Sequence, residues 1–173
     1  RPSRPSDVPS YRLVATDEAM IAAAVDEASE LAGRVPGGRA GVAVVCFDGA
    51  LFTKLKQEVA QRRKPFEVLS RRGDLATVNR AIETNRHVLA LAEYVGGLEF
   101  DAVVLVGVDE GRVPPLGTKG GSESRHFARY AAHNLLYVAV TRAREIVRVL
   151  ASAERGLSDI LHPAEAAGLL VRR

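Results

Sequence analysis

The residue best suited to chemistry in this sequence is Arg142. It is preceded, at spacings of three or four residues, by four apolar residues: Phe127, Ala131, Leu135 and Val138. On a helix these residues share one stripe, with Arg142 at its end. A guanidinium keeps its charge and presents a fork of donors that fits carboxylate or phosphate oxygens. Because arginine is rarely buried without a partner, Arg142 is expected either to form an ion pair at the helix end or to bind an anion.

A second candidate segment lies just before an apolar strand. The chain reads Gly96-Gly97-Leu98-Glu99-Phe100 and continues into the apolar run 101–108. From the residues alone, Gly97 indicates a turn and Glu99 a carboxylate at the start of a helix.

Together the two segments resemble a known family. Residues 135–144 read Leu-Leu-Tyr-Val-Ala-Val-Thr-Arg-Ala-Arg and resemble the sixth motif of superfamily 1 helicases of the UvrD/Rep type. Residues 97–101, Gly-Leu-Glu-Phe-Asp, resemble the core of that family's fifth motif. The resemblance implies the second RecA-like domain of an ATP-dependent DNA helicase or translocase, with a three-layer α/β fold of the P-loop NTPase type.

The same resemblance implies a role for each site residue. Arg142, which follows Thr141, is the expected catalytic arginine at the ATP γ-phosphate, Glu99 the ribose contact, and Gly97 a point of close backbone approach. Arg144, two residues further along, is expected to point to a different face and to matter much less. The cofactor implied is ATP with Mg²⁺, and the metal would be held by an N-terminal RecA-like domain that carries the P-loop.

No phosphate-binding Gly-x-x-x-x-Gly-Lys-Ser/Thr stretch occurs here, so this segment alone is not expected to hydrolyse ATP. Asp109 and Glu110 follow the strand 101–108. They are expected to begin a surface loop, as in the resembling family; the alternative is the metal-binding acidic pair of an ATPase.

The fifth motif departs from the family pattern at three positions. Leu91 and Glu93 stand where the family has a Thr-x-His that contacts single-stranded DNA, and Gly96 replaces its lysine. These changes should weaken a contact to the phosphate backbone. The alternative to a motor domain is therefore a non-catalytic RecA-like binding or regulatory module with degenerate DNA contacts.

Composition sets broad limits on the remaining possibilities. The chain has 173 residues, 47% of them apolar, and a formal net charge of +3, which fits one domain and permits an anionic partner. Two basic clusters are candidates for single-stranded or partly duplex DNA, or are simply solvated faces: Arg62-Arg63 and Arg71-Arg72. The four histidines and Cys46 show no metal-ligand spacing, so no metal site is predicted. With no apolar run near the ~18 residues of a membrane span and no leader, a cytoplasmic protein is predicted.

Apolar runs alternate with helical patterns along the chain, which predicts a mainly parallel sheet of five or six strands flanked by helices. Strands are expected at 11–14, 41–47, 66–69, 87–92, 101–108 and 145–151. Leu75, Val78 and Ile82 are expected to face inward from a helix over 74–84. Residues 1–10 read as a flexible linker or an artificial chain boundary, and residues 11–173 as one domain with no subdomain inserted between Leu69 and His87.

Overall fold

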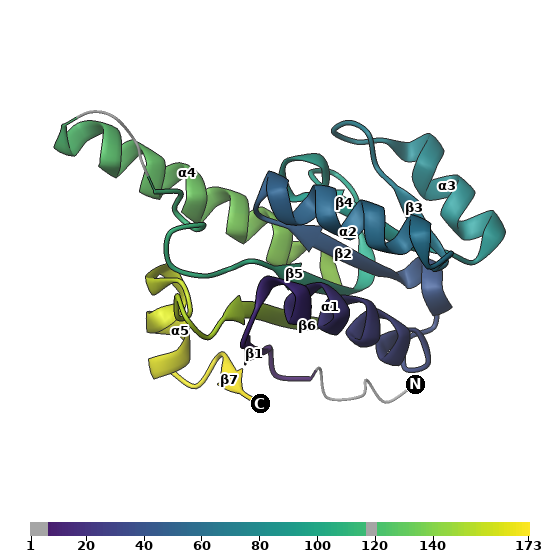
Figure 1. Cartoon of the computed structure of the whole chain (residues 1–173), viewed down its shortest axis with the longest axis horizontal. Helices are drawn as coiled ribbons and strands as arrows, with labels where there is room; N and C mark the ends of the chain where they lie inside the picture. The colour runs from purple at the N-terminus through teal and green to yellow at the C-terminus, as the bar shows by residue number, and fades with distance from the viewer. Residues whose placement is uncertain (1–6, 117–120) are drawn as a thin grey trace.

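A single parallel sheet forms the centre of the molecule (Figure 1). The computed structural model describes residues 7–116 and 121–173, and these residues form seven strands in the order β3-β4-β2-β5-β6-β1-β7. The strands are β1 (Ser10–Val14), β2 (Val42–Cys46), β3 (Phe66–Val68), β4 (His87–Leu91), β5 (Phe100–Val106), β6 (Ala143–Ser152) and β7 (Val171–Arg172). This confirms the predicted α/β class and parallel sheet, with β7 added at one edge.

Five α-helices connect the strands: α1 (Asp17–Ala32), α2 (Gly49–Gln61), α3 (Leu75–Thr84), α4 (Ser122–Thr141) and α5 (His162–Ala166). Short 3₁₀ segments occur at Gly38–Gly41, Ala92–Tyr94 and Asp159–Leu161. Three helices begin at a side-chain cap. Thr16, Asp48 and Asp74 accept hydrogen bonds from backbone N–H groups in the first turns of α1, α2 and α3. Such caps fix where each helix starts.

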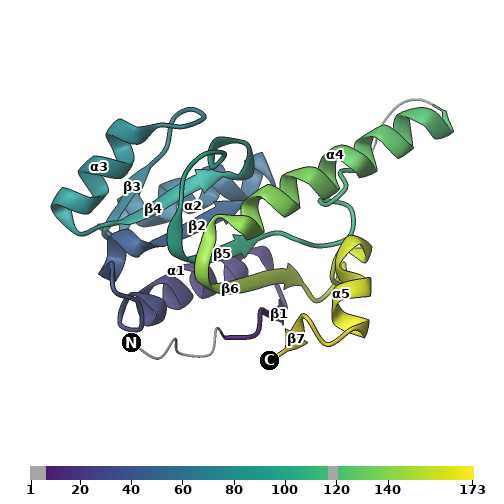
Figure 2. The same ribbon diagram turned by 180° about the vertical axis from the view of Figure 1, so that it is seen from behind.

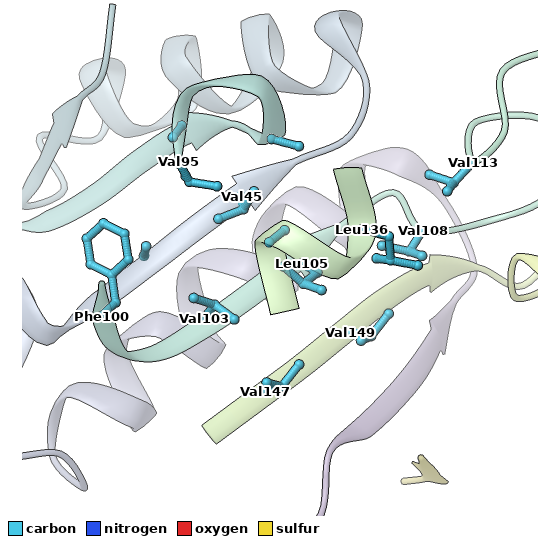
Figure 3. Close-up of a cluster of buried hydrophobic side chains, with 14 of the residues drawn as sticks. Val45, Val95, Phe100, Val103, Leu105, Val108, Val113, Leu136, Val147 and Val149 are labelled. Carbon is cyan, nitrogen blue, oxygen red and sulfur yellow. The ribbon is translucent and has the colours of Figure 1, made fainter. Parts of the chain in front are cut away.

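The sheet is covered on both faces, which gives the molecule three layers. Helices α1 and α2 pack on one face, and α3 and α4 contribute to the core on the other. Successive residues of β2 and β5 point alternately into the two cores, so both strands are fully buried. Figure 3 shows the second core, where Val103 and Leu105 of β5 lie near Val147 and Val149 of β6 and Leu136 of α4.

Two predicted helix faces are only partly right. On α3, Val78 is partly buried and packs against the core as predicted, but Leu75 and Ile82 are 60% and 61% exposed, and the buried residues are Thr77 and Ala81. Thr77 is drawn inward because its hydroxyl donates to the Asp74 carboxylate at 2.7 Å.

On α4 the predicted stripe is covered only in part, since Leu135 packs against the core but Phe127 is 74% exposed. Ala132, Leu136 and Ala139 form the buried face instead, and the amino-terminal half of the helix projects beyond the sheet (Figures 1 and 2). Small alanines let the other half lie close against β5 and β6.

Residues near both ends of the described chain belong to the sheet. Residues 1–6 of the predicted linker lie outside the described residues, whereas Ser10 already belongs to β1. At the other end of the chain, Arg172 of β7 pairs with Tyr11 of β1. No helix in the described part of the chain is long and apolar enough to cross a membrane.

Candidate functional site

The two sequence segments singled out above meet at the amino-terminal edge of the sheet. Strands β5 and β6 are parallel neighbours, with Phe100 opposite Ala143, so the residues just before each strand lie side by side (Figure 2). The backbone N–H of Phe100 donates to the carbonyl of Arg142 at 2.8 Å. Sheet pairing thus joins Gly97–Glu99 to Thr141–Arg142.

Arg142 is partly buried and closes α4. Its guanidinium donates to three neutral oxygens: the Val138 carbonyl at 3.2 Å, and the Leu98 carbonyl and Thr141 hydroxyl at 3.4 Å each. No carboxylate among residues 7–116 and 121–173 forms an ion pair with it. The ion-pair alternative from the sequence is therefore wrong within this part of the chain. The charge is oriented by neutral groups but is not neutralised, which suits an anion from outside the domain.

Thr141 is the last residue of α4 and is exposed. Its hydroxyl donates to the Val138 carbonyl at 2.9 Å and accepts from Arg142. Both residues therefore use the same carbonyl to end the helix, and Thr141 contributes to the orientation of the Arg142 side chain.

Gly97 adopts a left-handed backbone conformation, with φ of +81°. An added Cβ would meet nothing within 4 Å, so the backbone conformation, and not crowding, calls for glycine here. The N–H of Leu98 donates to the Val95 carbonyl at 3.1 Å and closes the turn. The predicted turn is present, and the space beside it is open.

Glu99 does not begin a helix, so the helix-start alternative is wrong. It lies between the Gly97 turn and β5, and its Oε2 accepts from Arg144 at 2.9 Å and 3.3 Å. Both side chains are about three-fifths exposed, at 62% for Glu99 and 60% for Arg144. The hydrogen bonds that Arg144 donates to Glu99 raise the pKa of the Arg144 guanidinium. A continued helix would have pointed Arg144 away from the site. Arg144 instead lies in β6, where it contacts Glu99.

The four arginines proposed for nucleic acid do not converge. Arg62 and Arg63 follow α2 and precede β3, whereas Arg71 and Arg72 follow β3 at the other end of that strand. Arg62 pairs with Glu58 of its own helix at 2.5 Å. The guanidinium of Arg72 lies 3.3 Å from where a Cβ on Gly96 would be. Arg72 therefore lies beside the altered fifth motif.

A buried ionic cluster at the opposite, carboxyl-terminal edge was not predicted. Asp109 is fully buried, and its Oδ2 accepts from the Arg112 guanidinium at 3.0 Å and from the Ser152 N–H at 2.9 Å. Arg112 also donates to both oxygens of Asp17 and lies 3.7 Å from Asp48. Burial raises the pKa of Asp109, and the Ser152 N–H and Arg112 oppose that shift. The surface-loop prediction for Asp109 is thus wrong.

The metal alternative for Asp109 and Glu110 finds no support either. The described residues contain no group of three or more potential metal ligands. The Glu110 carboxylate accepts a hydrogen bond from the backbone N–H of Asp159 at 2.6 Å. The one sequence signal for the cluster was Arg112, three residues after Asp109, which is the spacing of an i,i+3 ion pair.

Comparison with known proteins places the fold. No protein-family model matches the chain, and no curated protein matches it. Among solved structures, it is similar to the C-terminal domain of a possible DNA helicase from Lactobacillus plantarum WCFS1, with a TM-score of 0.66 and 19% identity over 96% of this chain and 86% of that one. The chain has the RecA-like fold of a helicase C-terminal domain.

A second solved structure with this fold is S. tokodaii Xpd4, with a TM-score of 0.50 and 12% identity. It aligns with 100% of this chain but only 39% of the Xpd4 chain. This domain therefore corresponds to less than half of that larger protein. At such identities the likeness concerns the fold, and the UvrD/Rep subtype stays a prediction from the two motifs.

Proposed function

We propose that this chain is the second RecA-like domain of an ATP-dependent DNA helicase or translocase of the UvrD/Rep type. In this proposal Arg142 reaches the γ-phosphate of an ATP bound mainly by a partner RecA-like domain, and Glu99 contacts the ribose. The observation that carries it is the guanidinium of Arg142, whose hydrogen-bond partners among the described residues are three neutral oxygens, one of them the Leu98 carbonyl beside the Gly97 turn.

The arrangement of these groups suits a site shared between two domains. Arg142, Thr141 and Glu99 lie together at one sheet edge, yet the sequence has no P-loop to cradle phosphates. The partner domain would supply that loop and the Mg²⁺, which neutralises phosphate charge when bound. This domain would add a cation that approaches the transferred phosphoryl group as charge shifts in the transition state.

The decisive experiment is Arg142→Ala in the full-length protein, with ATP turnover measured at saturating single-stranded DNA. Loss of an arginine finger costs on the order of 10³ to 10⁵ in turnover, so a fall of at least about a hundredfold is expected. Nucleotide affinity should change little, because the partner domain provides most of the binding contacts.

The matched control is Arg125→Ala, which removes an exposed arginine from the projecting half of α4. It should leave turnover within about twofold. Near-normal turnover in Arg142→Ala, with a lowered melting temperature, would make Arg142 a structural residue and end the motor proposal.

The second candidate is a non-catalytic RecA-like module, favoured by the changes at Leu91, Glu93 and Gly96. The two candidates differ in one measurement. A motor hydrolyses ATP faster when single-stranded DNA is added, whereas a binding module in the intact protein would show no DNA-stimulated turnover.

A further inference from the structure

Arg144 connects two carboxylates of very different character at the candidate site. Asp101 is only 9% exposed, and its Oδ2 accepts from the Gly37 N–H at 2.8 Å. A Cβ on Gly41 would lie 2.4 Å from the same oxygen, so the loop before β2 is packed directly against this carboxylate. Asp101 is therefore a fixed point at the amino-terminal edge.

The Arg144 guanidinium spans from this fixed carboxylate to the exposed one. One terminal nitrogen lies 3.7 Å from Oδ1 of Asp101, while Nε and the other terminal nitrogen donate to Oε2 of Glu99. Because an exposed ion pair by itself is weak, the second anchor matters. It limits the positions from which Arg144 can hold Glu99.

The pairing leaves half of the Glu99 carboxylate available. Both Arg144 nitrogens use Oε2, and Oε1 accepts no hydrogen bond from any residue within 7–116 or 121–173. A carboxylate has lone pairs on each oxygen, so it can accept from a guanidinium and from a ligand hydroxyl together.

We infer that Arg144 is a positioning residue, which holds Glu99 so that its second oxygen accepts a hydrogen bond from a ribose hydroxyl of the nucleotide. This inference rests on the proposed function, because it assumes that Glu99 faces a nucleotide. It adds a specific consequence: selection of ribonucleotide over deoxyribonucleotide triphosphate depends on Arg144 as well as on Glu99.

The test compares ATP, 2′-deoxy-ATP and 3′-deoxy-ATP as substrates of the full-length protein. A hydrogen bond to a charged group is worth about tenfold, so the wild type should prefer ATP over one deoxy analogue by about that factor in kcat/KM. Glu99→Ala should abolish the preference. Arg144→Ala should reduce it at least about threefold through KM, with kcat at saturating ATP nearly unchanged.

Controls separate positioning from a general structural effect. Glu145→Ala removes an exposed neighbour in β6 and should keep the full preference. The double variant Glu99→Ala/Arg144→Ala should show the same KM for ATP and the same lack of preference as Glu99→Ala alone, because both residues act through one hydrogen bond.

An unchanged preference in Arg144→Ala, or a lower KM for ATP, would overturn the inference; the lower KM would mean that Arg144 competes with the ribose. If the wild type shows no preference while Arg142→Ala still abolishes turnover, the inference fails and the proposed function stands.

Discussion

The two edges of the sheet treat arginine in opposite ways. At the carboxyl-terminal edge, the side chain of Arg112 is 7% exposed and faces Asp17, Asp48 and Asp109. At the amino-terminal edge, the partners of Arg142 within residues 7–116 and 121–173 are neutral oxygens. The first arrangement satisfies the guanidinium within the domain and ties loops together. The second orients a guanidinium and leaves its charge available, which is what a ligand site requires.

The contrast is informative because the carboxyl-terminal edge is where open α/β sheets usually bind ligands. Here that edge is occupied by a buried ionic cluster in which the Arg112 guanidinium is paired with carboxylates of the same domain. The candidate ligand-binding residues, Glu99 and Arg142, lie instead just before β5 and β6, at the amino-terminal edge. A search guided only by the usual position would therefore select Arg112 and miss Arg142.

The largest expected effect is on stability, from Arg112→Ala. Removing one partner of a buried ion pair typically costs about 3 to 5 kcal/mol, because Asp109 would be left buried without its cation. Urea denaturation of the domain should show a loss of that size.

The same substitution at Arg142 is the matched comparison and should cost less than about 1 kcal/mol, since only long hydrogen bonds to neutral acceptors are lost and no carboxylate of the described residues is left without its cation. Equal losses in the two variants would erase the difference between the edges. If Arg112→Ala is too unstable to purify, Asp17→Asn, which weakens the cluster at its more exposed carboxylate, should give an intermediate loss.

These contrasts also explain what the sequence could reveal. The apolar runs in β2 and β5 predicted buried parallel strands because no other placement covers both faces of such strands. The neighbouring positions of Glu99 and Arg142 followed from the resemblance, and the β5–β6 pairing accounts for them. The Asp109 cluster could not be predicted, since it needs three loops distant in sequence to meet at one edge.

The helix faces were predicted only in part for a related reason. Periodicity places Leu75, Val78 and Ile82 on one side of α3, but the fully buried residues are the small Ala81 and the Thr77 held by Asp74, and of the predicted set Val78 alone packs against the core. In α4 the apolar pattern includes Phe127, which belongs to the amino-terminal half of the helix, and that half projects beyond the sheet (Figure 1). Periodicity identifies an apolar stripe, whereas tertiary packing decides whether anything covers it.

An effect of medium size is expected when the pH is lowered. It concerns the stability of the domain and arises at His87, a buried residue at the amino-terminal edge of the sheet. His87 begins β4, is 2% exposed and stacks against Phe66 at 4.8 Å. Burial lowers the pKa of His87 from 6.5 to about 4. Between these values the unfolded chain binds more protons than the folded one, so stability should fall as the pH drops from about 6.5 toward about 4. The full contribution is about 3 kcal/mol.

The measurement is the free energy of unfolding against pH for the wild type and for His87→Gln. The variant should lack this component, so the difference between the two curves should change across that window and level off above it. A constant difference would show that His87 titrates normally and that this part of the edge is open to water.

The smallest expected effect concerns single-stranded DNA and Gly96→Lys. Because the four candidate arginines do not converge, affinity of the domain should be low and strongly dependent on salt. Gly96 does not have a positive φ, and the only close neighbour of an added Cβ is the flexible end of Arg72. A lysine there should therefore fold normally and place a second cation beside Arg72. We expect about threefold tighter binding, with the salt slope steeper by about 0.7, as one added phosphate contact to a single strand requires. Fluorescence anisotropy with a labelled oligonucleotide at several salt concentrations measures both quantities.

Gly96→Ala is the control for the backbone change and should bind as the wild type does. If Gly96→Lys leaves affinity unchanged while Arg62→Ala abolishes it, DNA follows the α2 end of the amino-terminal edge, and the open region beside Arg142 serves the nucleotide alone.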